Sequence, residues 1–270
     1  MRALRRWLRR KRGELRLGVR REEVRKLLSE HVGRQCRLTP AGARGRDSIY
    51  LVSDVERVFA CLRIVNPYLK RTPLEADMPF RVLSGTERIE REWSCYSRGA
   101  DSGLTPRPLW RTDDALACEF VDGARLMQQL LAQPQRFWEL MSVATLAVAK
   151  LHETCITHMD VSLANMVVGP RGNPVFIDFE YAPQENLNLA QQRAYDYLRL
   201  VESSIKFMPA ERASAEQHWL DTLERCTSAK TRGCDLNPLA PALGRLFAER
   251  STRLALARLF AESDTQPLCG

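Results

Sequence analysis

Residues 156–181 read ITHMDVSLANMVVGPRGNPVFIDFEY, the segment with the strongest structural signals in the chain. Residues 166–168 and 175–177 are short apolar runs that flank Gly-Pro-Arg-Gly-Asn-Pro, a sequence typical of a turn. The pattern predicts an antiparallel hairpin. Because Asn165 enters the hairpin and Asp178 leaves it, we expect both side chains at the same open end.

Oxygen-bearing side chains gather around this predicted hairpin. The side chains of Asn165 and Asp178 suit magnesium, which takes few protein oxygens and fills its other positions with phosphate and water. Asp160 stands at the start of the same loop, within reach of a hydroxyl that would receive a phosphoryl group. We therefore predict phosphoryl transfer from Mg-ATP, with Asp160 catalytic and Asn165 and Asp178 as metal ligands. The alternative is a chance hairpin with solvated carboxylates.

The motif HMDVSLANMVV followed by FIDFE resembles the catalytic loop and metal-binding segment of the protein-kinase-like superfamily, H-x-D-x-x-x-x-N and then D-F-x. The resemblance implies an α+β, bilobal protein-kinase-like fold with a small antiparallel-sheet N-lobe and a mainly helical C-lobe. It also implies ATP and Mg²⁺ as cofactors. In this family pattern His158 is a scaffold of the catalytic loop and His152 a buried structural residue. AYDYLRL places Asp196 where relatives carry an aspartate that braces the loop through backbone hydrogen bonds.

The region before this core has features of a nucleotide-binding lobe. CRLTPAGARGRDSIYLV reads as strand, turn and strand, and Gly42 and Gly45 let the backbone approach a phosphate. The next strand, VFACLRIV, carries Arg63 in a context similar to the VLR strands of Kdo kinases, choline kinases and aminoglycoside phosphotransferases. The resemblance implies that Arg63 binds the inner phosphates of the nucleotide. The alternative is an ordinary arginine at a strand edge.

A helix ending in ERIEREWSCYSRG follows this strand. By the same resemblance Glu92 is the partner of Arg63, with Glu90 and Glu87 as alternatives. Residues 115–121 form a further apolar strand that runs into Glu-Phe-Val-Asp-Gly, which resembles the hinge E-Y-x-x-G of the superfamily. The resemblance implies that backbone groups of Glu119 and Val121 bind adenine.

The chain therefore divides into three predicted parts: a basic amphipathic arm at 1–34, an N-lobe at 35–118 and a C-lobe at 119–270. In the arm, Leu4, Trp7 and Leu8 share one face and arginines surround it. This pattern favours peripheral contact of residues 2–12 with an anionic membrane. The alternatives are a solvated helix packed on the small lobe and a nucleic-acid contact. We expect no nucleic acid as a partner, because no recognition motif accompanies the arm.

Composition agrees with a folded protein that binds an anion. The 270 residues carry a net charge of +8, which favours an anionic partner such as a nucleotide. The eight cysteines form no CxxC pair and several lie in apolar runs, as reduced core thiols of a cytoplasmic protein do. No apolar core of a signal peptide follows the basic N-terminus, and the best apolar run, residues 141–149, is too short to span a bilayer. We expect a cytoplasmic protein that binds peripherally to the inner membrane or remains soluble.

Two absences bear on the acceptor. Ser162 stands where protein serine/threonine kinases have lysine, and the interval between Asp178 and Asp196 holds no A-P-E segment to support a peptide. Over about residues 40–200 the chain is most similar to the lipopolysaccharide-core kinases of Kdo and heptose. Residues 66–85 form a basic insertion comparable to one in Kdo kinases, and the alternative is a solvated loop. The resemblance implies phosphorylation of a sugar hydroxyl on an anionic glycolipid at the cytoplasmic membrane face. The alternatives are a small-molecule kinase of the aminoglycoside or choline type and an atypical protein kinase or pseudokinase with a regulatory role.

Overall fold

The computed structural model describes residue 8 and residues 11–41, 47–69, 77–169, 172–209 and 213–260. The fold is mixed α+β with an antiparallel sheet and many helices, so the predicted class is confirmed. The chain forms two compact units. Unit 1 holds Met1–Leu74, Ser84–Ser97 and Pro106–Val121, and unit 2 holds Glu75–Leu83, Arg98–Thr105 and Asp122–Gly270. These boundaries differ from the division predicted at residues 34 and 118, because residues 1–34 belong to unit 1 and Glu75–Leu83 and Arg98–Thr105 belong to unit 2.

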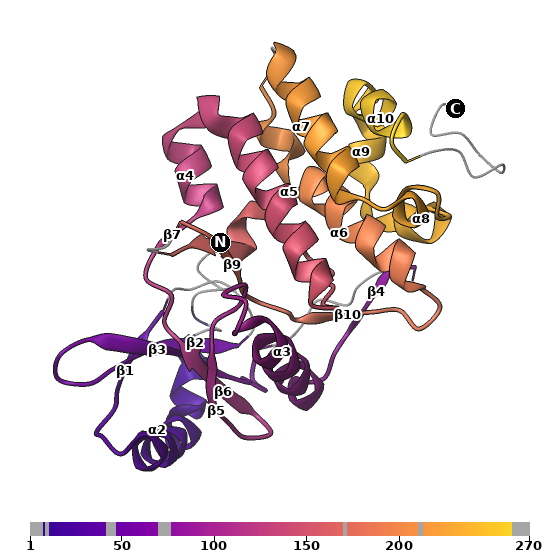
Figure 1. The fold of residues 1–270 in the computed structure, drawn as a ribbon. Helices are drawn as coiled ribbons and strands as arrows, with labels where there is room; N and C mark the ends of the chain where they lie inside the picture. The colour runs from indigo at the N-terminus through magenta and orange to yellow at the C-terminus, as the bar shows by residue number, and fades with distance from the viewer. Residues whose placement is uncertain are drawn as a thin grey trace. The chain divides into compact units, whose positions relative to one another are not determined.

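Unit 1 is built on a five-stranded antiparallel sheet in the order β1-β2-β3-β6-β5 (Figure 1). The strands are β1 (Arg37–Pro40), β2 (Ser48–Ser53), β3 (Val58–Ile64), β5 (Pro108–Arg111) and β6 (Ala115–Glu119). Side chains alternate between buried and half-buried along β3. Leu62 and Ile64 therefore face the hydrophobic core, and Arg63 points to the opposite face of the sheet.

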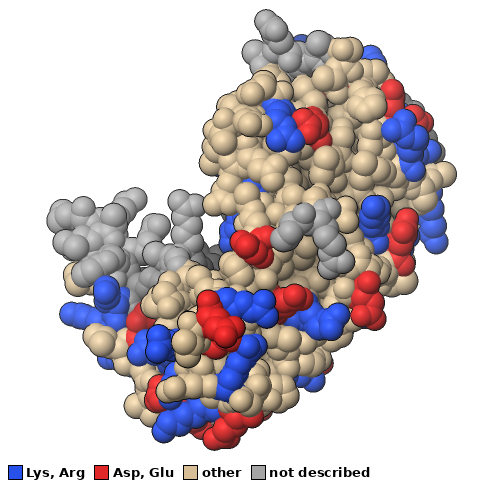
Figure 2. All heavy atoms as spheres, turned by 60° about the vertical axis from the view of Figure 1, so that its left-hand side comes forward, with Lys and Arg blue, Asp and Glu red and all other residues tan. Residues whose placement is uncertain are grey.

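Two helices belong to unit 1, α2 (Gly18–Val32) and α3 (Gly85–Gly99). Val24 and Leu28 of α2 are fully buried in the core that the sheet residues form. Gly33 ends α2 in the left-handed conformation, with φ 68°, and its N–H returns to the last turn. The described part of the basic arm thus belongs to unit 1. Figure 2 shows basic and acidic side chains interspersed over the unit 1 part of the face that it draws.

Unit 2 is mainly helical (Figure 1). Its long helix α5 buries ten of its side chains, among them Phe137, Met141 and Val148, so the predicted core helix is confirmed. The helices are α4 (Leu126–Ala132), α5 (Phe137–Glu153), α6 (Leu189–Ser204), α7 (Ala213–Cys226), α8 (Ala229–Arg232), α9 (Gly244–Ala248) and α10 (Arg250–Ala257). Short 3-10 helices are η1 (Pro134–Arg136), η2 (Leu163–Asn165), η3 (Ile205–Phe207) and η4 (Asn237–Ala242).

Unit 2 also holds two small antiparallel sheets. One joins β7 (Ala124–Arg125), β8 (Met166–Val168) and β9 (Pro174–Phe176), and the other joins β4 (Phe80–Val82) to β10 (Tyr181–Pro183). Just before β7, a Cβ atom on Gly123 would lie 2.0 Å from the Val168 carbonyl oxygen. Only glycine allows the chain to approach β8 so closely, and this contact fixes the start of the three-stranded sheet.

Two further features of the sequence can be compared with the structure. No helix in the described ranges is both long enough and apolar enough to cross a membrane. The described cysteines are free thiols, and four of them are buried: Cys36, Cys95, Cys118 and Cys234.

Candidate active site

The hairpin β8–β9 brings the predicted metal ligands to one end. Met166 pairs with Phe176, and the Ile177 N–H donates to the Asn165 carbonyl oxygen at 3.0 Å. Asp178 therefore follows directly on the residue that pairs with Asn165. The predicted hairpin is confirmed, with the second strand starting one residue earlier, at Pro174.

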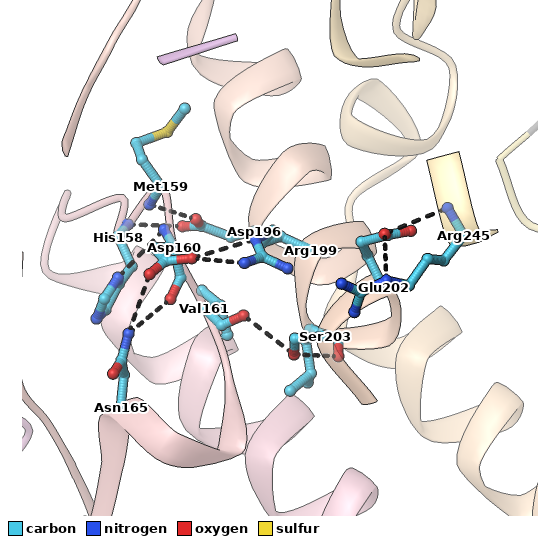
Figure 3. Close-up of polar contacts among 11 residues, drawn as sticks. His158, Met159, Asp160, Val161, Asn165, Asp196, Arg199, Glu202, Ser203 and Arg245 are labelled. Atoms are coloured by element: carbon cyan, nitrogen blue, oxygen red, sulfur yellow. Dashed lines mark hydrogen bonds and ion pairs between the residues drawn. The ribbon is translucent and has the colours of Figure 1, made fainter. Parts of the chain in front are cut away.

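Asn165 is oriented by the residue predicted to be catalytic. Its Nδ2 donates to the Asp160 backbone oxygen at 3.0 Å and to the Asp160 carboxylate at 3.3 Å (Figure 3). Within the described part of the chain the other end of this amide, Oδ1, accepts no hydrogen bond. Because the donor end is turned to Asp160, the oxygen end is the one presented to a cation.

A buried carboxylate on α6 holds the loop before Asp160. Asp196, which is fully buried, accepts hydrogen bonds from the backbone N–H groups of His158 and Met159, each at 2.8 Å (Figure 3). Its Oδ2 also contacts His152 Nε2 at 3.0 Å. The predicted hydrogen bonds between Asp196 and the backbone of the loop before Asp160 are thus confirmed, and His152 is buried as expected.

The backbone is strained at two points of the site. Met159 and Asp178 adopt positive φ angles of 65° and 71°. Such angles cost residues other than glycine of order 1 kcal/mol or more and persist where the surroundings impose them. At Met159 the Asp196 hydrogen bond supplies that constraint. Asp178 comes directly after the last hydrogen bond of the hairpin, which the Ile177 N–H donates. The hairpin therefore sets the backbone conformation of Asp178, and this conformation sets the direction of its carboxylate.

His158 links the two halves of the site. Its ring lies between the Asp160 N–H, 3.3 Å from Nδ1, and the Ile177 carbonyl oxygen, 3.1 Å from Nε2. This pair of contacts requires a neutral ring, with Nε2 donating and Nδ1 accepting. Burial lowers the pKa of His158, which favours the same neutral form. Its ring also packs on Phe179, with centroids 4.4 Å apart. The expected scaffold role of His158 fits these contacts.

Arg199 is a site residue that the sequence reasoning missed. Its Nη2 and Nε donate to Asp160 Oδ1 at 2.9 and 3.1 Å. A signal existed, because Arg199 is three residues after Asp196 and so lies on the same face of α6. Burial raises the pKa of Asp160, and the Arg199 charge acts in the opposite direction. The Asp160 side chain remains 24% exposed, so solvent or an acceptor can reach it.

Replacing Arg199 by glutamine should move the acid limb of the pH–rate profile to higher pH. The substitution removes a positive charge that lowers the pKa of Asp160, so the carboxylate would take up a proton at a higher pH than in the unmodified protein. Arg199→Lys keeps the charge and should give a smaller displacement. The measurement is kcat/KM of the predicted phosphoryl transfer from pH 5 to 9 for all three proteins. If the acid limbs of the three profiles coincided, Arg199 would not lower the pKa of Asp160.

The predicted partner of Arg63 is Glu92. Arg63 Nε lies 2.9 Å from Glu92 Oε2 in unit 1, and both side chains are largely buried. The two alternatives have other partners: Glu90 pairs with Arg111, and Glu87 accepts from the Ser84 N–H at the start of α3. The pairing of Arg63 with Glu92 is therefore confirmed, while the binding of phosphates stays a prediction.

Asp47 and Arg88 extend this pair into a buried network that the sequence reasoning did not foresee. Arg63 Nη1 contacts Asp47 at 3.1 Å, and both terminal nitrogens of Arg88 bind the same carboxylate. Burial alone would raise the pKa of Asp47, but the hydrogen bond and charge of Arg88 and the charge of Arg63 leave it below its ordinary value. Arg88 is four residues before Glu92, so helical spacing could have indicated it.

The other predicted nucleotide contacts are only partly described. Gly42 and Gly45 lie outside the described residues. The Glu119 N–H donates to the Arg107 carbonyl oxygen at 2.8 Å, and Phe120 N–H donates to Phe59. No hydrogen bond of the Val121 N–H is found among the described residues. The Glu119 N–H is therefore already used, and the adenine contacts of the other backbone groups of Glu119 and Val121 stay predictions.

The donor set at the hairpin end suits magnesium. In the described ranges no three His, Cys, Asp or Glu side chains cluster as a site built by protein ligands alone would require. One amide oxygen from Asn165 and one carboxylate from Asp178 form a smaller set. Magnesium uses such sets where nucleotide phosphates and water supply the remaining oxygens.

Comparisons with known proteins add no assignment. No protein-family model matches the chain, and no curated protein matches it at a significant level.

Proposed function

We propose that this chain is an ATP- and Mg²⁺-dependent kinase with the two-lobed protein-kinase-like fold, which transfers phosphate to an alcohol. One observation carries the proposal: Asn165, Asp160 and the residue before Asp178 are joined through hydrogen bonds at one end of the β8–β9 hairpin. A solvated hairpin does not need His158 and Asp196 buried beneath it to hold the loop. An active site does, since reacting groups must be held in position.

Each residue then has a defined task. Asp160 orients the acceptor hydroxyl and takes its proton, because its carboxylate is partly exposed and held by Arg199 and Asn165. Asn165 and Asp178 would hold magnesium, which when bound offsets charge on the nucleotide phosphates. Arg63, fixed by Glu92, would bind the inner phosphates, and backbone groups near Val121 would bind adenine. The protein's contribution is positioning and charge stabilisation.

For the acceptor we propose a sugar hydroxyl of the lipopolysaccharide core at the cytoplasmic membrane face. The net charge of +8 supports an anionic acceptor. Most of residues 2–12 lie outside the described ranges. In the helical segments that follow, Leu15 and Val19 are 80% and 85% exposed, beside the exposed Arg12 and Arg16. An apolar stripe with flanking basic residues suits an anionic lipid surface. Sedimentation of the protein with anionic vesicles tests this contact. If an equal fraction of the protein sedimented with zwitterionic vesicles, the result would contradict the contact.

A second candidate is a small-molecule kinase of the aminoglycoside or choline type. A cavity of about 730 Å³ in unit 2 is lined by two acidic residues, three amide residues and five apolar residues: Asp77, Glu185, Gln184, Asn186, Asn237, Met78, Leu187, Pro79, Pro238 and Pro241. No basic side chain is among its described lining residues. The acidic and amide residues favour a cationic or polyhydroxyl acceptor, and Gln184 in the wall is six residues after Asp178.

Transfer from radiolabelled ATP distinguishes the candidates. Core glycolipid, kanamycin and choline are supplied separately, each with and without magnesium. Label in the glycolipid alone supports the first candidate, and label in a cationic acceptor supports the second. Magnesium-dependent ATP binding without transfer to any acceptor would instead support a regulatory pseudokinase and would overturn the proposed reaction.

A further inference from the structure

A basic pocket of about 440 Å³ opens in unit 2 where α5, α6 and the end of α7 meet. Its lining includes three basic side chains, Lys150, Arg193 and Arg225, and a single carboxylate, Glu153, among the described residues. Its volume is typical of sites for small molecules. The excess of positive charge selects an anion.

Arg193 is fixed in the wall of this pocket. Its Nη2 donates to the His152 backbone oxygen at 3.0 Å, and no hydrogen bond of Nη1 is found in the part of the chain that the structure describes. Because Nε is buried, the terminal nitrogens are the donors that a ligand can reach. A planar fork of N–H donors fits a phosphate group better than it fits a halide or a water molecule.

The pocket is connected to the catalytic loop through one side chain. His152 lines the pocket and contacts Asp196 Oδ2 through Nε2 at 3.0 Å. Asp196 holds the N–H groups of His158 and Met159, the two residues before Asp160. One hydrogen bond therefore separates the pocket wall from the carboxylate that braces the loop.

We propose that this pocket is an effector site for a small phosphate-bearing metabolite. Its occupation fixes the last turn of α5, where Lys150 and His152 lie, and this stabilises the brace between His152 and Asp196. The loop that carries Asp160 is then held in one conformation for a larger fraction of the time. Binding at the pocket does not depend on the proposed kinase activity.

Calorimetric titration of the full chain with glucose 6-phosphate, inorganic phosphate and glucose tests the site. The pocket variant is Lys150→Gln/Arg225→Gln, both exposed side chains. The matched control is Arg250→Gln/Arg258→Gln, which removes the same charge from exposed positions at α10. We expect binding of glucose 6-phosphate, no binding of glucose, and at least tenfold weaker binding by the pocket variant alone. Equal binding by both variants, or no binding by the unmodified chain, would overturn the proposal.

Hydrogen exchange tests the connection to the loop without any activity assay. We expect glucose 6-phosphate to slow exchange of the His158 and Met159 amides in the unmodified chain but not in the pocket variant. If inorganic phosphate slowed exchange of these amides to the same extent, the phosphate group itself would be what the pocket recognises. Unchanged exchange with the ligand bound would refute the effector role and leave the proposed kinase reaction unaffected.

Discussion

Replacing Asp160 by asparagine is expected to reduce phosphoryl transfer by about 10²- to 10⁴-fold, the range that a positioned proton acceptor contributes. Asparagine keeps the shape of the side chain but takes no proton. Binding of Mg-ATP should change little, because the proposed metal ligands are Asn165 and Asp178. The measurement is the initial rate of label transfer to whichever acceptor the unmodified chain uses, with ATP affinity measured in parallel.

The matched control is Asp221→Asn on α7, an exposed carboxylate that among the described residues accepts a hydrogen bond from Gln217 alone. It makes the same chemical change outside the site and should leave the rate unchanged. If Asp160→Asn retained a rate within a few-fold of the control, Asp160 would not be the proton acceptor.

Replacing Asp47 by asparagine should destabilise unit 1 by about 3–5 kcal/mol, because two buried guanidinium groups are then left with the single carboxylate of Glu92. In the unmodified chain Arg63 and Arg88 both bind the Asp47 carboxylate, and their side chains are 15% and 5% exposed. The pKa of Asp47 lies below its ordinary value, so its stabilising contribution is complete above about pH 4 and is lost as the pH falls through the folded pKa. The free energy of unfolding of the variant and the unmodified chain should therefore converge in acid.

Urea denaturation followed through exchange of the β3 amides measures this effect. Asp113→Asn, an exposed aspartate of the same unit, is the matched control and should be neutral. The double variant Asp47→Asn/Arg88→Met also removes the charge of Arg88 that Asp47→Asn leaves uncompensated. Its loss in free energy of unfolding should therefore be smaller than the sum of the losses of the two single variants. Strict additivity, or an Asp47→Asn variant as stable as the control, would contradict the network.

The central hairpin and its brace could be predicted from the sequence because local signals and a motif agreed. Turn chemistry between two apolar runs was sufficient for β8 and β9, because their residues are neighbours in the sequence. Asp196 and Glu92 are 38 and 29 positions from their partners His158 and Arg63, and only the family resemblance indicated them.

The missed residues depend on packing between distant segments. Arg199 reaches Asp160 only because Asp196, one helical turn earlier, fixes α6 beneath the loop. Asp47 meets Arg88 across 41 positions of the chain, and no period or motif connects them. Helical spacing marked Arg199 and Arg88 as neighbours of known residues, but their targets become evident only in the folded chain.

The central claim is that Asn165 and Asp178 hold a nucleotide-bound metal ion beside Asp160. Calorimetric titration with ATP, with and without magnesium, tests it on the unmodified chain, Asp178→Asn and the control Asp221→Asn. We expect magnesium to strengthen ATP binding by the unmodified chain and by the control, and we expect this strengthening to be at least tenfold smaller in Asp178→Asn. Magnesium-dependent binding of equal strength in all three proteins would contradict it.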